Sequence, residues 1–177
     1  SLLSFQVCRQ SVRRCVMPLV KVLIRAVTRP WPLFTAAVIL ALCFAARTLL
    51  PVYFESIPVM PSLICCAVFC VIGLLFMAVP FVQYLSAGTT VYPGQSAEPK
   101  VLVKNGFNAI CRNPMYLGLV LFVLGAGIFI SGIYGIIGAA LLFLELDRVQ
   151  IPAEERALLG IFGADYSNYC RSVGRWF

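Results

Sequence analysis

The stretch that decides the fold is residues 115–144, MYLGLVLFVLGAGIFISGIYGIIGAALLFL, which contains no charged side chain. A single helix of this length would measure about 45 Å, well beyond the ~30 Å hydrocarbon core of a bilayer. Loops rich in lysine and arginine face the cytosol, and such segments flank this stretch on both sides. The stretch therefore crosses the membrane an even number of times, and we predict two helices, 112–129 and 133–150, with a turn near Ser131-Gly132. The flanking cations are Lys100, Lys104 and Arg112 before it, and Arg148, Arg156, Arg171 and Arg175 after it.

Two further apolar runs, 33–50 and 59–83, lie earlier in the chain. They complete a prediction of four transmembrane helices with both termini in the cytosol. We expect a kink or break at Pro80 in the second run. Glycine and proline punctuate residues 84–111, which we interpret as a structured cytosolic loop packed against the spans.

The two ends of the chain have different characters. In residues 1–29 cations recur at multiples of four beside apolar positions, which predicts a basic amphipathic helix on the membrane surface. For residues 151–177 we predict a cytosolic helical tail, in which Gly163 separates one helix from a second helical turn. The overall expectation is an all-α polytopic membrane protein with an interfacial segment, 1–29, and a membrane domain, 30–177.

Composition supports this fold class and excludes others. Of 177 residues, 61% are hydrophobic and 12% charged, whereas a soluble domain is about half apolar and a quarter charged. The net charge of +7 would indicate nucleic acid in a soluble protein. Here the cations flank apolar runs, which indicates binding to anionic lipid headgroups and no nucleic-acid partner.

The cysteines and glycines do not indicate metal or dinucleotide chemistry. The chain has eight cysteines and no histidine, so we expect buried thiols and no metal site. A Ser-His-Asp or Cys-His arrangement is excluded for the same reason. Gly125-Ala126-Gly127 has no strand before it, so it is no Rossmann fingerprint. We expect close helix packing at five glycines instead: Gly118, Gly125, Gly132, Gly135 and Gly138.

Two cytosolic segments hold the candidates for chemistry. In the first, Asn113 and Pro114 suit the cap and first position of a helix. Arg112 and Tyr116 lie close to the same helix start. In the second, Glu154 and Glu155 suit the first turn of a helix that starts near Pro152. A purely structural interpretation is open for each of these residues. We also expect Glu145 and Arg148 to pair, because they lie three positions apart on a helix.

At these two segments the sequence resembles the membrane methyltransferase family that includes isoprenylcysteine carboxyl methyltransferases and phospholipid N-methyltransferases. The resemblance covers roughly residues 85–177. The compact form of the chain resembles that of bacterial members of the family. The first matching features are Gly88-Thr89-Thr90, Leu102-Val103, Gly106 and Arg112-Asn113-Pro114-Met115-Tyr116-Leu117-Gly118. The later ones are Glu154-Glu155, Phe162-Gly163, Tyr166, Tyr169 and Arg175-Trp176.

The resemblance implies S-adenosylmethionine as the methyl donor and a lipidic or lipid-anchored acceptor in the bilayer. It also implies a location in the bacterial cytoplasmic membrane, with the endoplasmic reticulum as the open alternative. The implied cofactor contacts are Lys100, Val101, Leu102, Val103, Asn113, Pro114, Met115, Tyr116 and Glu154. The implied catalytic candidates are Arg148, Arg112 and Glu155, of which an arginine would orient the acceptor.

Three positions depart from the family pattern. Asn113 stands where the family often has histidine, and Asn108 stands where it usually has an aromatic residue. Gln150 occupies the place expected for the acceptor-binding arginine, and Arg148 is the nearest cation.

The activity that follows is direct methyl transfer, in which the protein positions two reactants and excludes water. A carboxylate acceptor needs no base, whereas an amine must first lose a proton, so the absence of histidine favours a carboxylate. Three alternatives stay open: N-methylation of a phospholipid or small amine, a non-enzymatic membrane protein, and a nicotinamide-dependent reductase of related fold.

Overall fold

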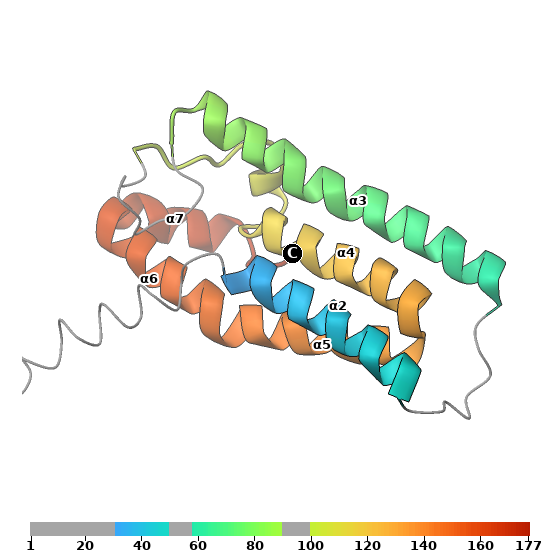
Figure 1. The fold of residues 1–177 in the computed structure, drawn as a ribbon. Coiled ribbons are helices and arrows are strands. Elements are labelled where there is room, and N and C mark those ends of the chain that lie inside the picture. Colours follow the sequence, from blue (N-terminus) through green and yellow to red (C-terminus); the bar gives the residue numbers. More distant parts are fainter. Residues whose placement is uncertain (1–30, 50–57, 90–99) are drawn as a thin grey trace, which may run out of the picture. The chain divides into compact units, whose positions relative to one another are not determined.

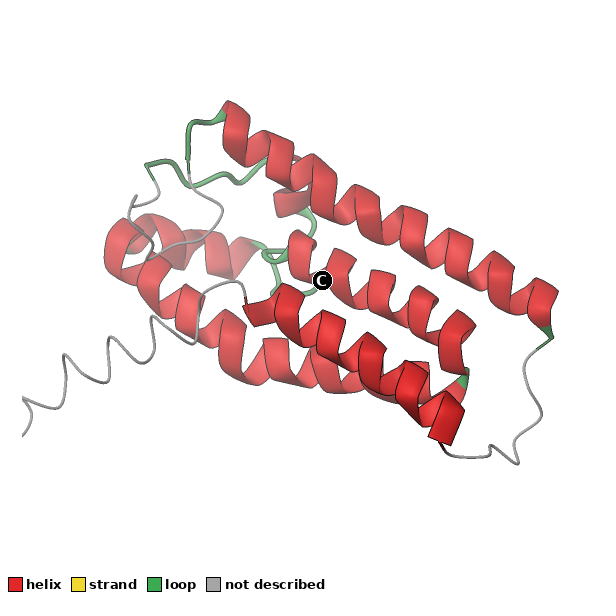
Figure 2. Ribbon diagram, viewed as in Figure 1, coloured by secondary structure: helices red, strands yellow, loops and turns green. Residues whose placement is uncertain are grey.

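The computed structural model describes residues 31–49, 58–89 and 100–177. The chain divides into two compact units, Ser1–Trp31 and Pro32–Phe177, and the fold described below is that of the second. The predicted amphipathic helix over 1–29 and the boundary that follows it lie outside the described residues. Throughout the described ranges every regular element is a helix and none is a strand (Figure 2), which confirms the all-α class.

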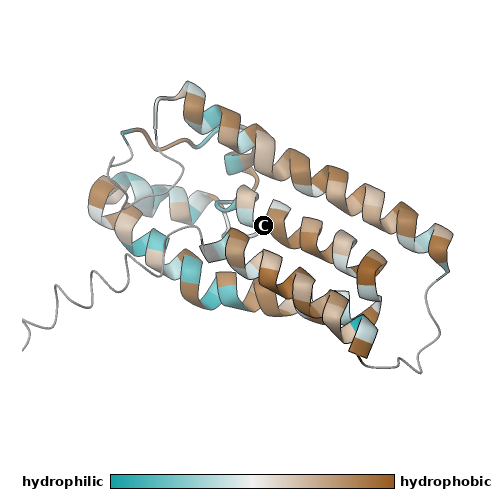
Figure 3. Cartoon of the chain, in the orientation of Figure 1, coloured by the Kyte–Doolittle hydropathy of each residue, from teal (hydrophilic) through white to brown (hydrophobic). Residues whose placement is uncertain are grey.

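Among the described residues, three helices are long and apolar enough to cross a membrane. They are α2 (Trp31–Leu49), α3 (Val59–Ser86) and α4 (Pro114–Ser131). Each overlaps a predicted span. Helix α3 continues through Pro80, so no break occurs there, and the alternative of a kink stays a prediction. Large apolar side chains such as Leu42, Phe44 and Ile64 are exposed on these helices, and the apolar surface follows their length (Figure 3). Such surfaces require lipid, so the chain is an integral membrane protein.

The fourth predicted span corresponds to two elements. Helix α5 (Ile133–Glu145) has 13 residues, which gives about 20 Å and falls short of the ~30 Å hydrocarbon core. The π-helical turn η2 (Leu146–Gln150) continues it. A fourth crossing therefore needs both elements, and this crossing and the cytosolic termini stay predictions.

The helices pack side by side around a small apolar core (Figure 1). Helix α4 lies between α3 and α5, with extensive contacts to both. Helix α2 is joined to the beginning of α5 and the end of α4, because the Cys43 thiol donates to the Tyr134 carbonyl and Arg47 donates to the Ile130 carbonyl. The buried core residues are Ala36, Leu119, Val123, Ala139, Leu142, Leu146 and Ile151.

Glycines permit the close approach of these helices. A Cβ on Gly135 would lie 2.0 Å from the Gly127 carbonyl carbon, so α4 and α5 touch through backbone at this pair. A Cβ on Gly118 would similarly lie 2.5 Å from the Gly73 carbonyl oxygen. The packing prediction is confirmed for Gly118, Gly125, Gly135 and Gly138. It is wrong for Gly132, which has open space around it and a φ of +59°, and which forms the turn between α4 and α5.

Helix α5 continues through η2 into the tail without an interruption. The Ile151 amide donates to the Leu146 carbonyl in the π-helical pattern, and α6 (Ile151–Phe162) follows directly. Pro152 explains the widened turn, because a proline ring clashes with the carbonyl four residues earlier and offers no N–H to it. After Gly163 the chain forms α7 (Ala164–Ser172), as predicted.

Candidate functional site

A cavity of about 110 Å³ lies where the end of α3, the loop after it, the start of α4 and helices α6 and α7 meet. This volume is several times that needed for a single water molecule, roughly 10–15 Å³. The cavity is at the end of the unit where polar residues replace the apolar helix surfaces (Figure 3). Its lining residues are Tyr84, Thr89, Val101, Leu102, Val103, Asn108, Arg112, Asn113, Pro114, Met115, Tyr116, Glu154, Glu155, Leu158, Phe162, Tyr166 and Tyr169.

Most of the residues singled out from the sequence meet at this cavity. The two segments contribute Val101–Val103, Arg112–Tyr116, Glu154 and Glu155. Lys100 is exposed and does not line it. Arg148 does not line it either: its side chain is 77% exposed and pairs with Asp147 at 3.4 Å. The expected pair between Glu145 and Arg148 is therefore wrong, and both Glu145 carboxylate oxygens are buried without a partner.

Several lining residues escaped the sequence-based choice of site residues. Thr89, Phe162, Tyr166 and Tyr169 belong to the motifs that carry the family resemblance, but no role was assigned to them. Leu158 lies one helical turn after Glu154, so helical periodicity could have placed it on the same face. Tyr84 carries no local signal, because it lies within the apolar sequence of α3.

The loop between α3 and α4 is held against α3 near the cavity. Gly106 has a φ of +61° and lies so close to Gln83 that a Cβ would meet the Gln83 amide nitrogen at 2.1 Å. It opens the short 3₁₀ helix η1 (Gly106–Ala109), in which Phe107 packs edge-on against Phe76. The described part of the loop is thus packed against the spans, as predicted.

Asn108 is the most constrained residue of this loop. It is 1% exposed. Its side-chain oxygen accepts from the Tyr84 hydroxyl at 2.7 Å, and its backbone carbonyl accepts from the Tyr169 hydroxyl at 2.5 Å. The nitrogen of its side-chain amide has no partner. Asn108 therefore joins α3 to α7 and retains one unused donor beside the cavity.

Glu154 is the acidic group held by hydrogen bonds at the cavity. The Tyr116 hydroxyl donates to its Oε1 atom, and the Gln150 amide donates to the same atom at 2.7 Å. Burial raises the pKa of Glu154, and the nearby Glu155 raises it further, while the two hydrogen bonds lower it. The carboxylate is thus desolvated but hydrogen-bonded in a form that can carry charge.

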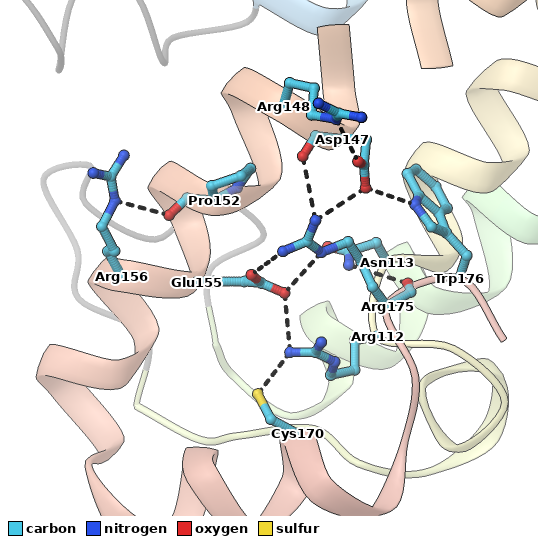
Figure 4. A network of polar contacts seen from close by, with 10 residues as sticks. All are labelled: Arg112, Asn113, Asp147, Arg148, Pro152, Glu155, Arg156, Cys170, Arg175 and Trp176. Carbon is cyan, nitrogen blue, oxygen red and sulfur yellow. Dashed lines mark hydrogen bonds and ion pairs between the residues drawn. The ribbon is translucent and has the colours of Figure 1, made fainter. Parts of the chain in front are cut away.

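Glu155 belongs to a cluster of charges beside the cavity (Figure 4). Its carboxylate lies 2.9 Å from Arg112 and 2.7 Å from Arg175. Arg175 also binds Asp147 at 3.0 Å, and the Trp176 indole donates to that carboxylate. The pair with Glu155 raises the pKa of the Arg175 guanidinium above its usual value. Glu155 is therefore engaged in ion pairs and is poorly placed to act as a base.

The C-terminal segment closes one side of this cluster. The Arg112 amide donates to the Gly174 carbonyl at 3.0 Å, and the Asn113 side chain donates to the Arg175 carbonyl at 3.3 Å. Asn113 does stand at the start of α4, but its side chain makes no capping bond to the helix. Its role in the fold is to fasten the C-terminal segment to the mouth of α4.

Arg112 retains capacity for a ligand. Its side chain is 12% exposed and uses one terminal nitrogen for Glu155 and for the Cys170 sulfur. Its Nε atom is buried without a partner. A buried donor without a partner costs free energy unless something binds to it. The cavity is thus lined by a carboxyl group, that of Glu154, by two residues with buried donors that lack partners, Arg112 and Asn108, and by apolar side chains.

The fold and the site together define a helical membrane protein with a cavity of apolar and polar side chains at one end of its apolar helices. No protein-family model matches the sequence, and no solved structure matches it. Among curated proteins, the chain is similar to a protein-S-isoprenylcysteine O-methyltransferase from Schizosaccharomyces pombe, with 27% identity over 100 residues. The alignment covers 51% of this chain and 42% of that relative, so the chain spans less than half of the relative's length.

Proposed function

We propose that this protein transfers a methyl group from S-adenosylmethionine to the carboxylate of a membrane-associated acceptor. The observation that carries the proposal is the meeting of Glu154 and Arg112 in one cavity at the end of apolar helices. The similarity to a protein-S-isoprenylcysteine O-methyltransferase supports the reaction class. Four spans, cytosolic termini and a place in the bacterial cytoplasmic membrane are parts of the same proposal.

The lining residues fit the methyl donor chemically. S-adenosylmethionine combines an apolar ring surface, ribose hydroxyls, a carboxylate and a positive sulfonium. Val101, Leu158 and Phe162 offer apolar contact, and Glu154 offers an acceptor for hydroxyls or a partner for positive charge. The unused side-chain donor of Asn108 suits the acceptor atoms of such a ligand.

The chemistry supplied by S-adenosylmethionine is an electrophilic methyl group: the acceptor's oxygen bonds to that carbon, the carbon–sulfur bond breaks, and its electron pair stays on sulfur. A carboxylate acceptor is already ionised, so no proton has to leave. The protein's work is to hold the two reactants in line and to exclude water.

Arg112 is the cation that we assign to the acceptor. It lines the cavity, whereas Arg148 is exposed outside it. The Glu155 ion pair fixes the Arg112 guanidinium, and its Nε–H remains available to a carboxylate. Glu155 therefore serves as a positioning residue, with no proton to take from the substrate.

An amine acceptor is the second candidate. Glu154 favours it, because burial raises the pKa of this carboxylate and so makes it a better proton acceptor than an ordinary glutamate. A phospholipid amine or a small amine would then be deprotonated at Glu154 before transfer.

The products distinguish these two acceptors. The purified protein in lipid nanodiscs is incubated with S-adenosyl-[methyl-³H]methionine and either an S-prenylated N-acetylcysteine or phosphatidylethanolamine. Carboxyl methylation yields a methyl ester, which alkali hydrolyses to volatile labelled methanol, whereas a methylated amine is stable to alkali. Alkali-labile label that depends on the prenylated acid supports the proposal. Alkali-stable label in the lipid establishes the second candidate, and no label with either acceptor contradicts both.

A further inference from the structure

Gln150 holds the cavity carboxylate from a position outside the cavity. It is 1% exposed, at the last residue of the π-helical turn η2, and it is not among the lining residues. Its amide nitrogen lies 2.7 Å from the Glu154 Oε1 atom and 3.4 Å from the Tyr116 hydroxyl oxygen. Tyr116 donates to the same carboxylate oxygen. Two neutral donors, one from α4 and one from η2, therefore converge on one oxygen of Glu154.

We propose that Gln150 is a positioning residue that, with Tyr116, keeps Glu154 as an uncompensated anion facing the positive centre of the methyl donor. This inference rests on the proposed function and gives Glu154 one role among those that its chemistry allows. A carboxylate that only bound ribose hydroxyls would contact charged and uncharged forms of the ligand equally. A carboxylate that faces the sulfonium distinguishes S-adenosylmethionine from the neutral thioether S-adenosylhomocysteine.

The type of side chain at position 150 decides the charge of the site. A glutamine amide stabilises a carboxylate by hydrogen bonding but carries no charge of its own. An arginine there would form an ion pair with Glu154 and would neutralise it. With Gln150, the negative charge of Glu154 stays available to a cationic ligand in a cavity where low polarity strengthens electrostatic attraction.

Within the part of the chain that the structure describes, no ion pair joins Glu154 to a cation. The groups that act on it are Tyr116, Gln150, Glu155 and Tyr84. Glu155 is the only formal charge among these, and it is negative and already paired with Arg112 and Arg175. Among the described residues the acid therefore relies on neutral donors, and Gln150 is the one of these that does not line the cavity.

The wide turn places Gln150 for this role. Gln150 and Glu154 lie four positions apart, so their side chains share one face across the junction of η2 and α6. Glu155, the next residue, turns toward Arg112 and Arg175. Two adjacent acids thus serve different purposes, one toward the cavity and one toward the ion-pair cluster.

The test compares the two ligands in calorimetric titrations from pH 4.5, the ordinary pKa of a glutamate, up to about pH 9. The variants are Gln150→Leu, which removes the donor at similar volume, and Gln150→Glu, which keeps the shape. Removal of a hydrogen bond to a charged group should move the pH midpoint of S-adenosylmethionine binding upward by about one unit. Binding below the new midpoint should weaken about tenfold and recover at high pH. S-adenosylhomocysteine binding should change little, and Gln150→Glu should raise the midpoint further.

The possible failures are distinguishable. An unchanged midpoint in both folded variants overturns the role of Gln150 while leaving the proposed function intact. An equal loss of both ligands at every pH shows a purely structural role and also overturns it. If the wild-type protein binds neither ligand, the proposed function itself fails. Should Gln150→Leu not fold, Gln150→Glu decides alone, because it differs from the wild type by one amide group.

Discussion

The Arg112 guanidinium lies 2.9 Å from the Glu155 carboxylate, and the two side chains are 12% and 18% exposed. Glu155 also accepts two hydrogen bonds from Arg175. One carboxylate therefore connects the mouth of α4, the first turns of α6 and the C-terminal segment. Glu155 therefore stabilises the segments that surround the cavity. Its position next to Glu154 in the sequence does not predict that the two acids have different roles.

Replacement of Glu155 should weaken the fold. Glu155→Gln would leave Arg112 and Arg175 without their shared partner, and we expect a loss of about 2 kcal/mol in the free energy of unfolding, since the pairs are only partly buried. The matched control is Arg148→Ala, which removes an exposed pair and should change stability by less than about 0.5 kcal/mol. Denaturant titrations of both variants in mixed micelles measure the difference. Equal stability of the two variants would show that the cluster contributes nothing.

The contact between Tyr84 and Asn108 should be measurable as a coupling. Tyr84→Phe and Asn108→Leu each remove one partner of the 2.7 Å hydrogen bond, and each should cost about 1–2 kcal/mol because the other partner stays buried. The double variant should cost less than the sum of the two by about 1 kcal/mol. Thermal unfolding of the three variants tests this, and strict additivity would contradict the bond.

The glycine contact between α4 and α5 predicts a steric effect. In Gly135→Ala the new Cβ would lie 2.0 Å from the Gly127 carbonyl carbon, so the helices must separate, with an expected loss of about 1–3 kcal/mol. Gly160→Ala is the control, because no atom lies within 4 Å of its Cβ position and alanine favours a helix. It should leave stability unchanged or raise it by up to about 1 kcal/mol. A harmless Gly135→Ala would contradict the close packing.

Glu154 predicts a pH dependence of ligand binding with a defined sign. Burial raises the pKa of its carboxyl group above the ordinary value of 4.5, so the anion is lost at a higher pH than in an exposed glutamate. Affinity for a cationic ligand should therefore fall as the pH falls through this raised pKa, and should be full above it. Glu154→Gln should abolish this component of the pH dependence. A midpoint at or below the ordinary value would contradict the effect of burial.

The sequence was sufficient for the three helices that are long enough to cross a membrane and for the two segments that build the cavity. The apolar runs have lengths that only a bilayer explains, and the turn at Gly132 follows from the length of residues 115–144. Capping preferences placed the start of α4 at Asn113. These features are local, and local patterns determine them.

The partners of the charged residues could not be predicted in this way. Helical spacing predicted that Arg148 would pair with Glu145, but Arg148 pairs with Asp147 instead. Asp147 also binds Arg175 and Trp176 from the C-terminal segment. The side chain of Asn113 similarly binds the Arg175 carbonyl. The partners of these side chains depend on how segments distant in sequence pack together. The widened turn at η2 further changes the directions in which the side chains of residues 146–150 point.

The measurement that tests the central claim most directly is a calorimetric titration of the protein in lipid nanodiscs with S-adenosylmethionine. The wild type is compared with Glu154→Ala and with Arg156→Ala, which replaces an exposed side chain that donates to the Pro152 carbonyl of its own helix. We predict saturable binding to the wild type and to Arg156→Ala, and at least about tenfold weaker binding to Glu154→Ala, a difference of about 1.4 kcal/mol. Absence of binding to the folded wild-type protein, or equal affinity in all three proteins, would contradict the assignment of this cavity to the methyl donor.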